Sequence, residues 1–134
     1  MQFSSRLPIA IHILLVIYTF KDEYKLTSDF IASSVGVNPV TIRNILGQLK
    51  AADLVDITAG VGGAALKKSL DEITFYDVFQ AVEEDRDLFH IHENPNPNCA
   101  VGKNIHKILD GKLNAIKIAM NSKMKEITLS SLLL

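Results

Sequence analysis

Two runs of apolar residues at helical spacing lie on either side of Gly36 in this chain. Ile31 and Val35 belong to the first run and predict a short helix. Gly36 supplies the positive φ that a tight turn requires. The second helix, 39–50, has a start signal of its own, because Asn38 is a helix-capping residue and a proline follows it. The arrangement is typical of a helix-turn-helix, and the alternative is an ordinary helical hairpin in an all-α core.

The second helix separates an apolar face from a polar one. Its predicted buried face consists of Ile42, Ile45, Leu46 and Leu49. A helix-turn-helix that reads DNA presents the opposite face to base edges in the major groove. The residues predicted to contact DNA from this helix and its cap are Asn38, Val40, Thr41, Arg43, Asn44 and Gln48. We expect direct base contacts from Thr41, Asn44 and Gln48, and a contact of Arg43 with phosphate or a guanine edge.

A strand pattern follows the second helix. Residues 53–58 alternate between apolar and polar, and residues 64–68 are expected to return as a partner strand. Between them, Gly60, Gly62 and Gly63 predict a tight tip that lets main-chain N–H groups approach phosphate closely. A hairpin directly after a helix-turn-helix is typical of a winged helix. The alternatives are a loose hairpin and a phosphate-binding loop, but no Gly-Lys-Ser/Thr follows to support the loop.

The chain as a whole is predicted to be mainly α with this small β-hairpin, organised as one integrated domain. Residues 1–84 are interpreted as a winged helix-turn-helix domain that begins with a buried helix at 7–20. Residues 85–101 form a loop rich in proline and asparagine, and residues 102–134 form a dimerisation helix with an apolar tail. The apolar run of the first helix is too short to span a bilayer, so no membrane segment is predicted.

The long C-terminal helix carries one apolar stripe over about six turns. The stripe consists of Ile105, Leu109, Leu113, Ile116, Met120 and Met124. A domain this small offers little surface to cover it, so we expect the matching helix of a second subunit to do so, which makes the protein a homodimer. The alternative is that the first helix covers the stripe within one chain.

Charge is unevenly distributed, although the formal net charge is only −1. Residues 70–93 contain eight acidic residues against one arginine, whereas residues 102–126 contain six lysines against two acidic residues. In the predicted DNA-binding head, 27–66, two basic residues stand against three acidic ones. Phosphate contacts supply much of the affinity for DNA, so this head is electrostatically poor. Its low charge favours, as the alternative function, a winged-helix module that binds protein.

Segments 49–55 (LKAADLV) and 72–83 (EITFYDVFQAVE), with the glycine tip between them, resemble the Rrf2 family of bacterial winged-helix transcriptional regulators, relatives of the iron–sulfur cluster regulator IscR. The loop at 89–105 is most similar to the YwnA-like branch of that family. The resemblance implies a homodimer built on the long helix, with the helix 39–50 in the major groove of a near-palindromic operator and the wing at the minor groove. Asp53 stands where the family usually has glycine, and Ala59 where many members have arginine.

Cysteine usage departs from that of the sensing members of the family, which hold an iron–sulfur cluster with three cysteines in the loop before the long helix. This chain has Cys99 alone there, so we expect no cluster and no other cofactor. Cys99 is a candidate thiol sensor, because a helix N-terminus lowers the pKa of a cysteine; the alternative is an inert residue. Zinc held by Cys99 with His90, His92 and His106 is a further alternative, but paired ligand spacing is absent and no metal site is predicted.

The chain shows no signature of an enzyme, because no serine lies in a nucleophile elbow and no histidine has a recognisable orienting partner. A single cysteine fits a reducing cytoplasm. The sequence therefore predicts a cytoplasmic transcriptional regulator, expected to be a repressor, that binds double-stranded operator DNA as a homodimer. An unknown small-molecule effector is its other expected partner.

Overall fold

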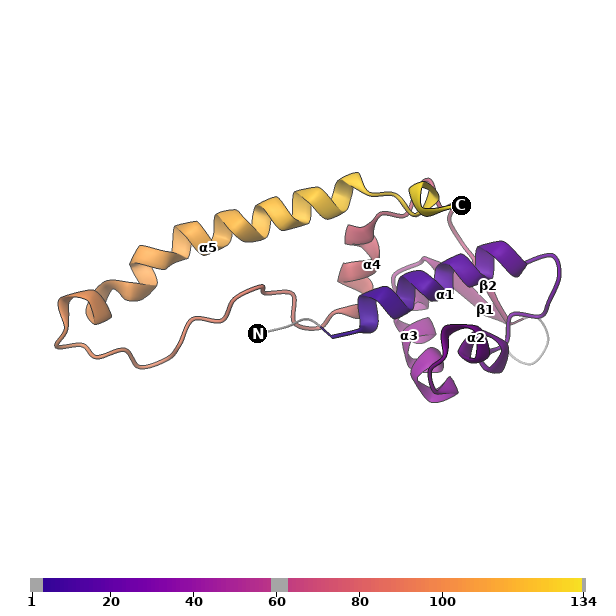
Figure 1. The fold of residues 1–134 in the computed structure, drawn as a ribbon, viewed down its shortest axis with the longest axis horizontal. Helices are drawn as coiled ribbons and strands as arrows, with labels where there is room; N and C mark the ends of the chain where they lie inside the picture. The colour runs from indigo at the N-terminus through magenta and orange to yellow at the C-terminus, as the bar shows by residue number, and fades with distance from the viewer. Residues whose placement is uncertain (1–3, 59–62, 134) are drawn as a thin grey trace.

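The computed structural model describes residues 4–58 and 63–133. Its elements are α1 (Arg6–Phe20), α2 (Ser28–Val35), α3 (Pro39–Ala51), β1 (Val55–Thr58), β2 (Gly63–Leu66), α4 (Phe75–Val82), α5 (Ala100–Glu126) and the 3-10 helix η1 (Leu129–Leu132) (Figure 1). The prediction of a mainly α fold with one β-hairpin and a long C-terminal helix is confirmed.

Helix α1 lies at the centre of the core. It packs against α2, α3, α4 and β2, so it is enclosed on several sides. Its sequence is apolar around most of its circumference, as expected for a helix buried in this way. The buried residues of α1 are Ala10, Ile13, Leu14, Val16 and Ile17. Within the part of the chain that the structure describes, no helix is both long enough and apolar enough to cross a membrane.

The helix pair α2–α3 forms as its local signals predict. Gly36 ends α2 with φ +81°, and its N–H donates to the carbonyl of Ala32 at 2.8 Å. Asn38 caps α3, because its Oδ1 accepts a hydrogen bond of 2.8 Å from the N–H of Val40. The buried residues of α3 are Ile42, Ile45, Leu46 and Leu49, so the predicted apolar face is confirmed.

The hairpin is antiparallel, with a register that runs from Val55 opposite Leu66 to Thr58 opposite Gly63. The strands differ from the predicted 53–58 and 64–68, because β1 covers Val55–Thr58 and β2 covers Gly63–Leu66, with Gly63 paired to Thr58. Gly63 also forms a parallel bridge with Leu26, the residue before the cap of α2. The N–H of Ala64 donates to the Leu26 carbonyl at 2.9 Å. We call this pairing of Leu26 with Gly63 and Ala64 the wing-base contact. It joins the hairpin to the entry of the helix pair.

Helix α5 projects from the rest of the molecule, and residues 83–99 run back beside it (Figure 1). Its C-terminal end is tied to the start of α4, because the N–H of Phe75 donates to Ile127 and the N–H of Leu129 donates to Ile73, each at 2.9 Å. The principal helical neighbour of α5 is therefore α4. The alternative prediction, in which α1 covers the apolar stripe of α5 within one chain, is wrong. Although all of α5 is described, none of its residues is buried.

Candidate nucleic-acid interface

The solvent-facing side of α3 carries most of the residues predicted to contact DNA. Asn38, Arg43 and Asn44 are exposed, and 53% of the Val40 surface is accessible. Thr41 is half-buried on the same helix. The buried stripe on the opposite side fixes this orientation, because Ile42 and Ile45 are fully enclosed in the core. The fold therefore offers one guanidinium, amide and hydroxyl groups and a methyl-bearing side chain from one helical surface.

Gln48 has a partner that the sequence did not indicate. Its Oε1 accepts a hydrogen bond from the guanidinium of Arg6, which also donates from Nε to the carbonyl of Val82 at 3.2 Å. Arg6 is 42 positions from Gln48 in the sequence and belongs to α1. Folding thus adds a positive charge near the end of α3. No local pattern could have revealed it, because the contact depends on how α1 packs beside α3 and α4.

The same end of α1 is held by a second contact. The hydroxyl of Ser4 donates to the carboxylate of Glu83 at 2.9 Å, and Glu83 is the one charged residue that is buried among the described residues. This bond places the start of α1 against the end of α4. Arg6 is consequently positioned by backbone and side-chain contacts rather than left as a free surface cation.

The base of the wing contains an internal ion pair. Lys67 Nζ lies 3.2 Å from a carboxylate oxygen of Asp53, and this partner raises the pKa of Lys67. Asp53 has φ +61°, a left-handed conformation in which glycine is favoured. The pairing directs the charge of Lys67 toward Asp53. Gly63 is the first residue of β2, whereas Gly60 and Gly62 lie outside the described residues.

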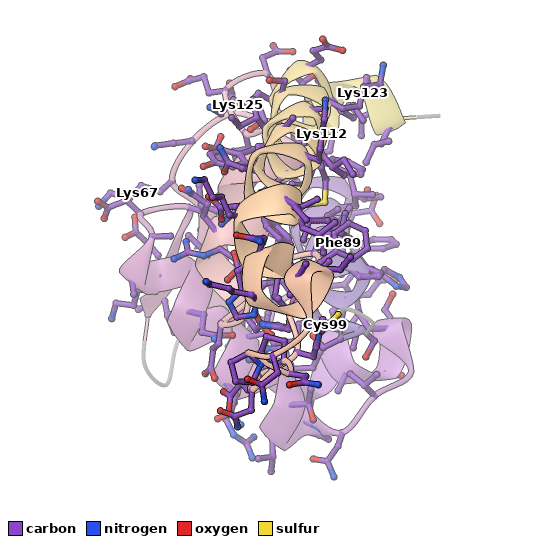
Figure 2. The ribbon with its side chains drawn as sticks, turned by 90° about the vertical axis from the view of Figure 1, so that its left-hand side faces the viewer. Lys67, Phe89, Cys99, Lys112, Lys123 and Lys125 are labelled. Atoms are coloured by element: carbon purple, nitrogen blue, oxygen red, sulfur yellow. The ribbon has the colours of Figure 1, made fainter. Side chains whose placement is uncertain are left out.

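The predicted dimerisation residues lie along α5 with intermediate to high exposure. Ile116 is 45% exposed, and two further residues of the same helix outside the predicted set, Ile108 and Ile118, are 55% and 56% exposed. Leu113 shares a hollow with Leu88, Phe89 and Ile91 of the preceding loop, and Figure 2 shows Phe89 beside the helix. The loop is also attached by an ion pair of 2.6 Å between Lys117 and Asp87. One chain alone therefore leaves apolar surface of α5 accessible.

A sequence profile of the Rrf2 family, described as iron-dependent transcriptional regulators, matches residues 3–134. The chain belongs to the Rrf2 family. It is 42% identical over 132 residues to the "Putative HTH-type transcriptional regulator YwnA" of Bacillus subtilis (strain 168), covering 98% of this chain and 97% of that protein. A solved structure described as a "putative DNA binding protein" superposes with a TM-score of 0.77 at 38% identity, covering 96% of this chain and 98% of the other.

More distant Rrf2-type folds are also similar. The structure of CymR (YrzC), described as the global cysteine regulator of B. subtilis, has a TM-score of 0.69 at 20% identity and covers 98% of this chain and 95% of its own. Identity this low supports the fold alone. Together with YwnA, these comparisons confirm the resemblance to a winged helix-turn-helix family of transcriptional regulators. Its members are regulators and not enzymes, which agrees with the absence of a catalytic signature.

The donors of this Rrf2 chain do not fit a cysteine-ligated iron–sulfur cluster. Such clusters are held by several thiolates, and the sequence contains one cysteine, Cys99. Among the described residues, the one group of ligand-type side chains whose donor atoms lie within 4.8 Å of one another is Asp85, Asp87 and His90. All three are exposed, and Asp87 is engaged by Lys117. The zinc alternative is not supported either, because His106 Nε2 bonds to the carbonyl of His92 at 2.9 Å and no group containing Cys99 forms in the described part.

Helix α5 begins at Ala100, two residues before the predicted start at 102, so Cys99 is its N-cap residue and not an interior residue of the loop. The thiol is exposed at the near end of the helix in Figure 2. The backbone N–H groups of Gly102 and Val101, in the first turn of α5, lower the pKa of Cys99. This is the effect expected of a helix N-terminus on a thiolate.

Proposed function

We propose that this Rrf2 protein is a sequence-specific DNA-binding regulator that acts in the cytoplasm as a homodimer. The observation that carries the proposal is the presentation of α3, whose Asn38-capped start and polar face point away from a fully buried apolar stripe. A helix presented in this way enters the major groove in helix-turn-helix proteins. The hairpin then lies at the adjacent minor groove. The names of YwnA and of the superposed DNA-binding protein support the same function.

The proposed contacts divide into base readout and backbone positioning. Thr41 and Asn44 contact bases, and Val40 offers an apolar contact to a thymine methyl group. Arg43 pairs with phosphate or a guanine edge. Gln48 contributes through its amide nitrogen, because its Oε1 is bonded to Arg6. The guanidinium of Arg6, added to this list by the structure, is a candidate phosphate contact at the same end of α3.

The wing and the helix N-terminus add contacts through the backbone. Gly60, Gly62 and Gly63 are proposed to let main-chain N–H groups approach the minor-groove edge, since glycine has no side chain to obstruct them. Asn38 contacts phosphate from the start of α3, where a helix dipole favours an anion. These contacts carry little sequence information, so they position the reading helix rather than select the operator.

The dimer is proposed to form through α5. Its contact residues are Ile105, Leu109, Leu113, Ile116, Met120 and Met124, and the exposed Ile108 lies on the same helix. Pairing of α5 with its copy removes this apolar surface from water. A two-fold axis presents two reading helices to one side of DNA, so the operator is near-palindromic. We propose repression as the outcome, because a dimer seated on its operator occludes the DNA, and we propose that no cluster is required.

Fluorescence anisotropy tests the proposal. Reduced protein is titrated against DNA from upstream of its own gene and against scrambled DNA, at two salt concentrations. We expect tighter binding to the native sequence, weakened by salt. Arg43→Ala should reduce affinity about tenfold and the salt slope by about one, whereas Asn44→Ala should reduce discrimination without changing the slope. Arg86→Ala, which removes an exposed arginine from the loop beside α5, serves as the control and should behave as the parent.

A protein-interaction module is the second candidate, favoured by the low charge of the head and by the engagement of Lys67 with Asp53. It predicts equal or absent binding to native and scrambled DNA at both salts. It also predicts that Arg43→Ala leaves affinity and salt slope unchanged. Either result would show that the assigned residues of α3 do not contact DNA.

A further inference from the structure

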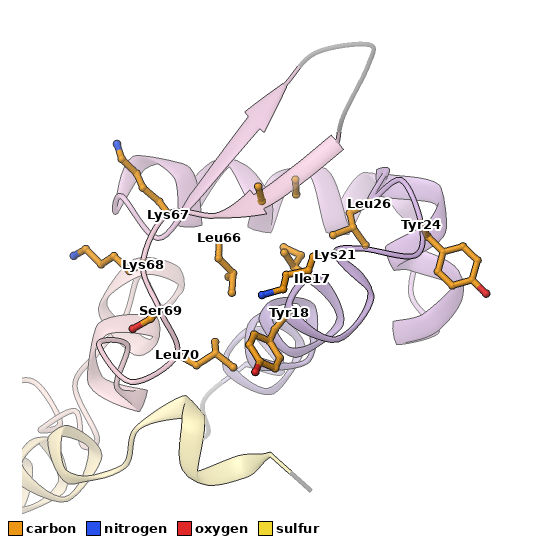
Figure 3. Close-up of a pocket in the computed structure, with 12 residues that line it drawn as sticks. Ile17, Tyr18, Lys21, Tyr24, Leu26, Leu66, Lys67, Lys68, Ser69 and Leu70 are labelled. Carbon is orange, nitrogen blue, oxygen red and sulfur yellow. The ribbon is translucent and has the colours of Figure 1, made fainter.

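A pocket of about 500 Å³ lies at the base of the wing (Figure 3). It is enclosed by the C-terminal end of α1, by Tyr24 and Leu26 from the segment before α2, and by β2 with the residues that follow it. We call it the wing-base pocket. Its floor is apolar and buried, formed by Ile17, Leu26, Ala64 and Leu70. Ligand sites for small molecules have volumes of about 300–1,000 Å³ and are lined mainly by apolar side chains. The wing-base pocket matches both features.

The rim of the wing-base pocket has one sign of charge. Lys21, Lys67 and Lys68 line it, and none of its twelve lining residues is acidic, although the chain holds more acidic than basic residues. Lys67 is paired with Asp53, but Lys21 has no ion pair within the described part of the chain. In Figure 3 the side chain of Lys21 extends across the pocket opening, whereas Lys67 and Lys68 turn outward. Lys21 lies 4.9 Å from the centre of the Tyr18 ring.

We propose that the wing-base pocket binds a small amphipathic carboxylate, whose apolar body lies on the floor and whose carboxylate pairs with Lys21. An apolar surface alone accepts any apolar molecule, so the unpaired cation over it is what selects an anion. Tyr18 forms an aromatic wall beside the same ammonium group. The ligand class is therefore an aromatic or aliphatic acid with one carboxylate and a compact hydrocarbon part.

The location of the pocket gives its occupant a regulatory role, and this part of the inference rests on the proposed DNA-binding function. Leu26 and Ala64 both line the pocket, and the hydrogen bond of 2.9 Å between them belongs to the wing-base contact. A molecule seated there touches the segment that enters α2 and the strand that carries the wing. Binding consequently shifts the wing relative to the α2–α3 pair and weakens operator binding.

Titration of the ¹⁵N-labelled full chain with 4-phenylbutyrate, followed by amide chemical shifts, tests binding without DNA. The neutral 4-phenylbutanamide, matched in shape, is the comparison ligand. We expect saturable shifts at Tyr18, Lys21, Leu26 and Ala64, and binding of the acid at least about tenfold tighter than that of the amide. Absence of shifts in the pocket, shifts confined to α5, or equal affinity for acid and amide would each overturn the proposal.

Two variants assign the recognition to Lys21. Lys21→Met keeps the aliphatic stem and removes the charge, and it should weaken 4-phenylbutyrate about tenfold while leaving the amide unchanged. Lys112→Met makes the same replacement on α5, outside the pocket, and should leave both ligands unchanged. The circular dichroism spectrum of each variant shows whether it is folded. A folded Lys21→Met protein that binds the acid as the parent does contradicts the role of Lys21.

Anisotropy with operator DNA tests the regulatory part separately. Saturating 4-phenylbutyrate should lower operator affinity of the parent protein several-fold and have a smaller effect on Lys21→Met. Unchanged affinity with an occupied pocket refutes the regulatory role but leaves the binding site standing. If the protein binds no operator at all, the proposed function fails while the chemical-shift result still decides whether the pocket takes a carboxylate.

Discussion

Replacing Gly63 by alanine is the sharpest test of how the wing is attached. Gly63 has φ +71°, and a Cβ placed on it would lie 2.2 Å from the carbonyl oxygen of Leu26. That oxygen is a backbone atom and accepts a hydrogen bond from the N–H of Ala64, so the clash cannot be relieved by moving a flexible side chain. The wing-base contact must open to accept the methyl group.

The loss of unfolding free energy in Gly63→Ala follows from the left-handed backbone at Gly63 and from the close Leu26 carbonyl. An L-residue other than glycine in the left-handed region costs about 1 kcal/mol. Separating Leu26 from Ala64 loses one backbone hydrogen bond and leaves a poorly satisfied carbonyl, which costs about 1–3 kcal/mol more. We therefore expect Gly63→Ala to lower the free energy of unfolding by about 2–4 kcal/mol, a large part of the stability of a typical domain.

Gly47→Ala is the matched control. Gly47 lies in α3, and a Cβ added there meets nothing within 4 Å. The same chemical change should therefore stabilise the protein by about 1 kcal/mol through helix propensity. Urea unfolding followed by circular dichroism measures both, at one fixed protomer concentration because a dimer makes stability depend on concentration. If both variants change stability in the same direction, or Gly63→Ala costs less than about 1 kcal/mol, the inferred role of the wing-base contact is wrong.

Three further predictions concern other parts of the molecule. Asp53 has φ +61°, so Asp53→Gly should raise the free energy of unfolding by about 0.5–1 kcal/mol, whereas Asp53→Ala should not. Urea unfolding of both variants measures this, and equal effects would mean that the backbone conformation at Asp53 is unstrained. Because backbone N–H groups lower the pKa of Cys99, its alkylation by iodoacetamide should reach half-maximal rate at a lower pH than that of a free cysteine, and an ordinary profile would exclude a stabilised thiolate. Ile116→Asp places a charge on the exposed apolar surface of α5 and should yield a folded monomer by size-exclusion chromatography with light scattering, whereas a persistent dimer would remove Ile116 from the interface.

Local signals account for most of the elements that the sequence predicted. The cap at Asn38, the left-handed Gly36 and the apolar stripe of α3 each act within a few residues, and all three appear in the structure as expected. The substitution at Asp53 was also visible as a departure from the family. Its meaning came from the structure, which shows the left-handed backbone that favours glycine there.

Contacts between distant segments could not be read in the same way. Gly63 forms a parallel bridge with Leu26, and the partner of Gln48 is Arg6 at the start of α1. Neither pairing leaves a periodic trace in the sequence. The wing-base pocket likewise forms only where α1, the entry of α2 and β2 meet.

The sequence by itself determined the helix-turn-helix, the hairpin, the long C-terminal helix and the family, because hydrophobic period, caps and motif order are local properties. Tertiary structure alone decided where Arg6 lies and how the wing is joined to Leu26. It also decided that the side chain of Lys21 lines a pocket with an apolar floor. Tertiary packing likewise decided that α5 packs on α4 and leaves apolar residues such as Ile108, Ile116 and Ile118 exposed. These features arise from packing between elements far apart in the chain, and such packing has no signature in any single segment.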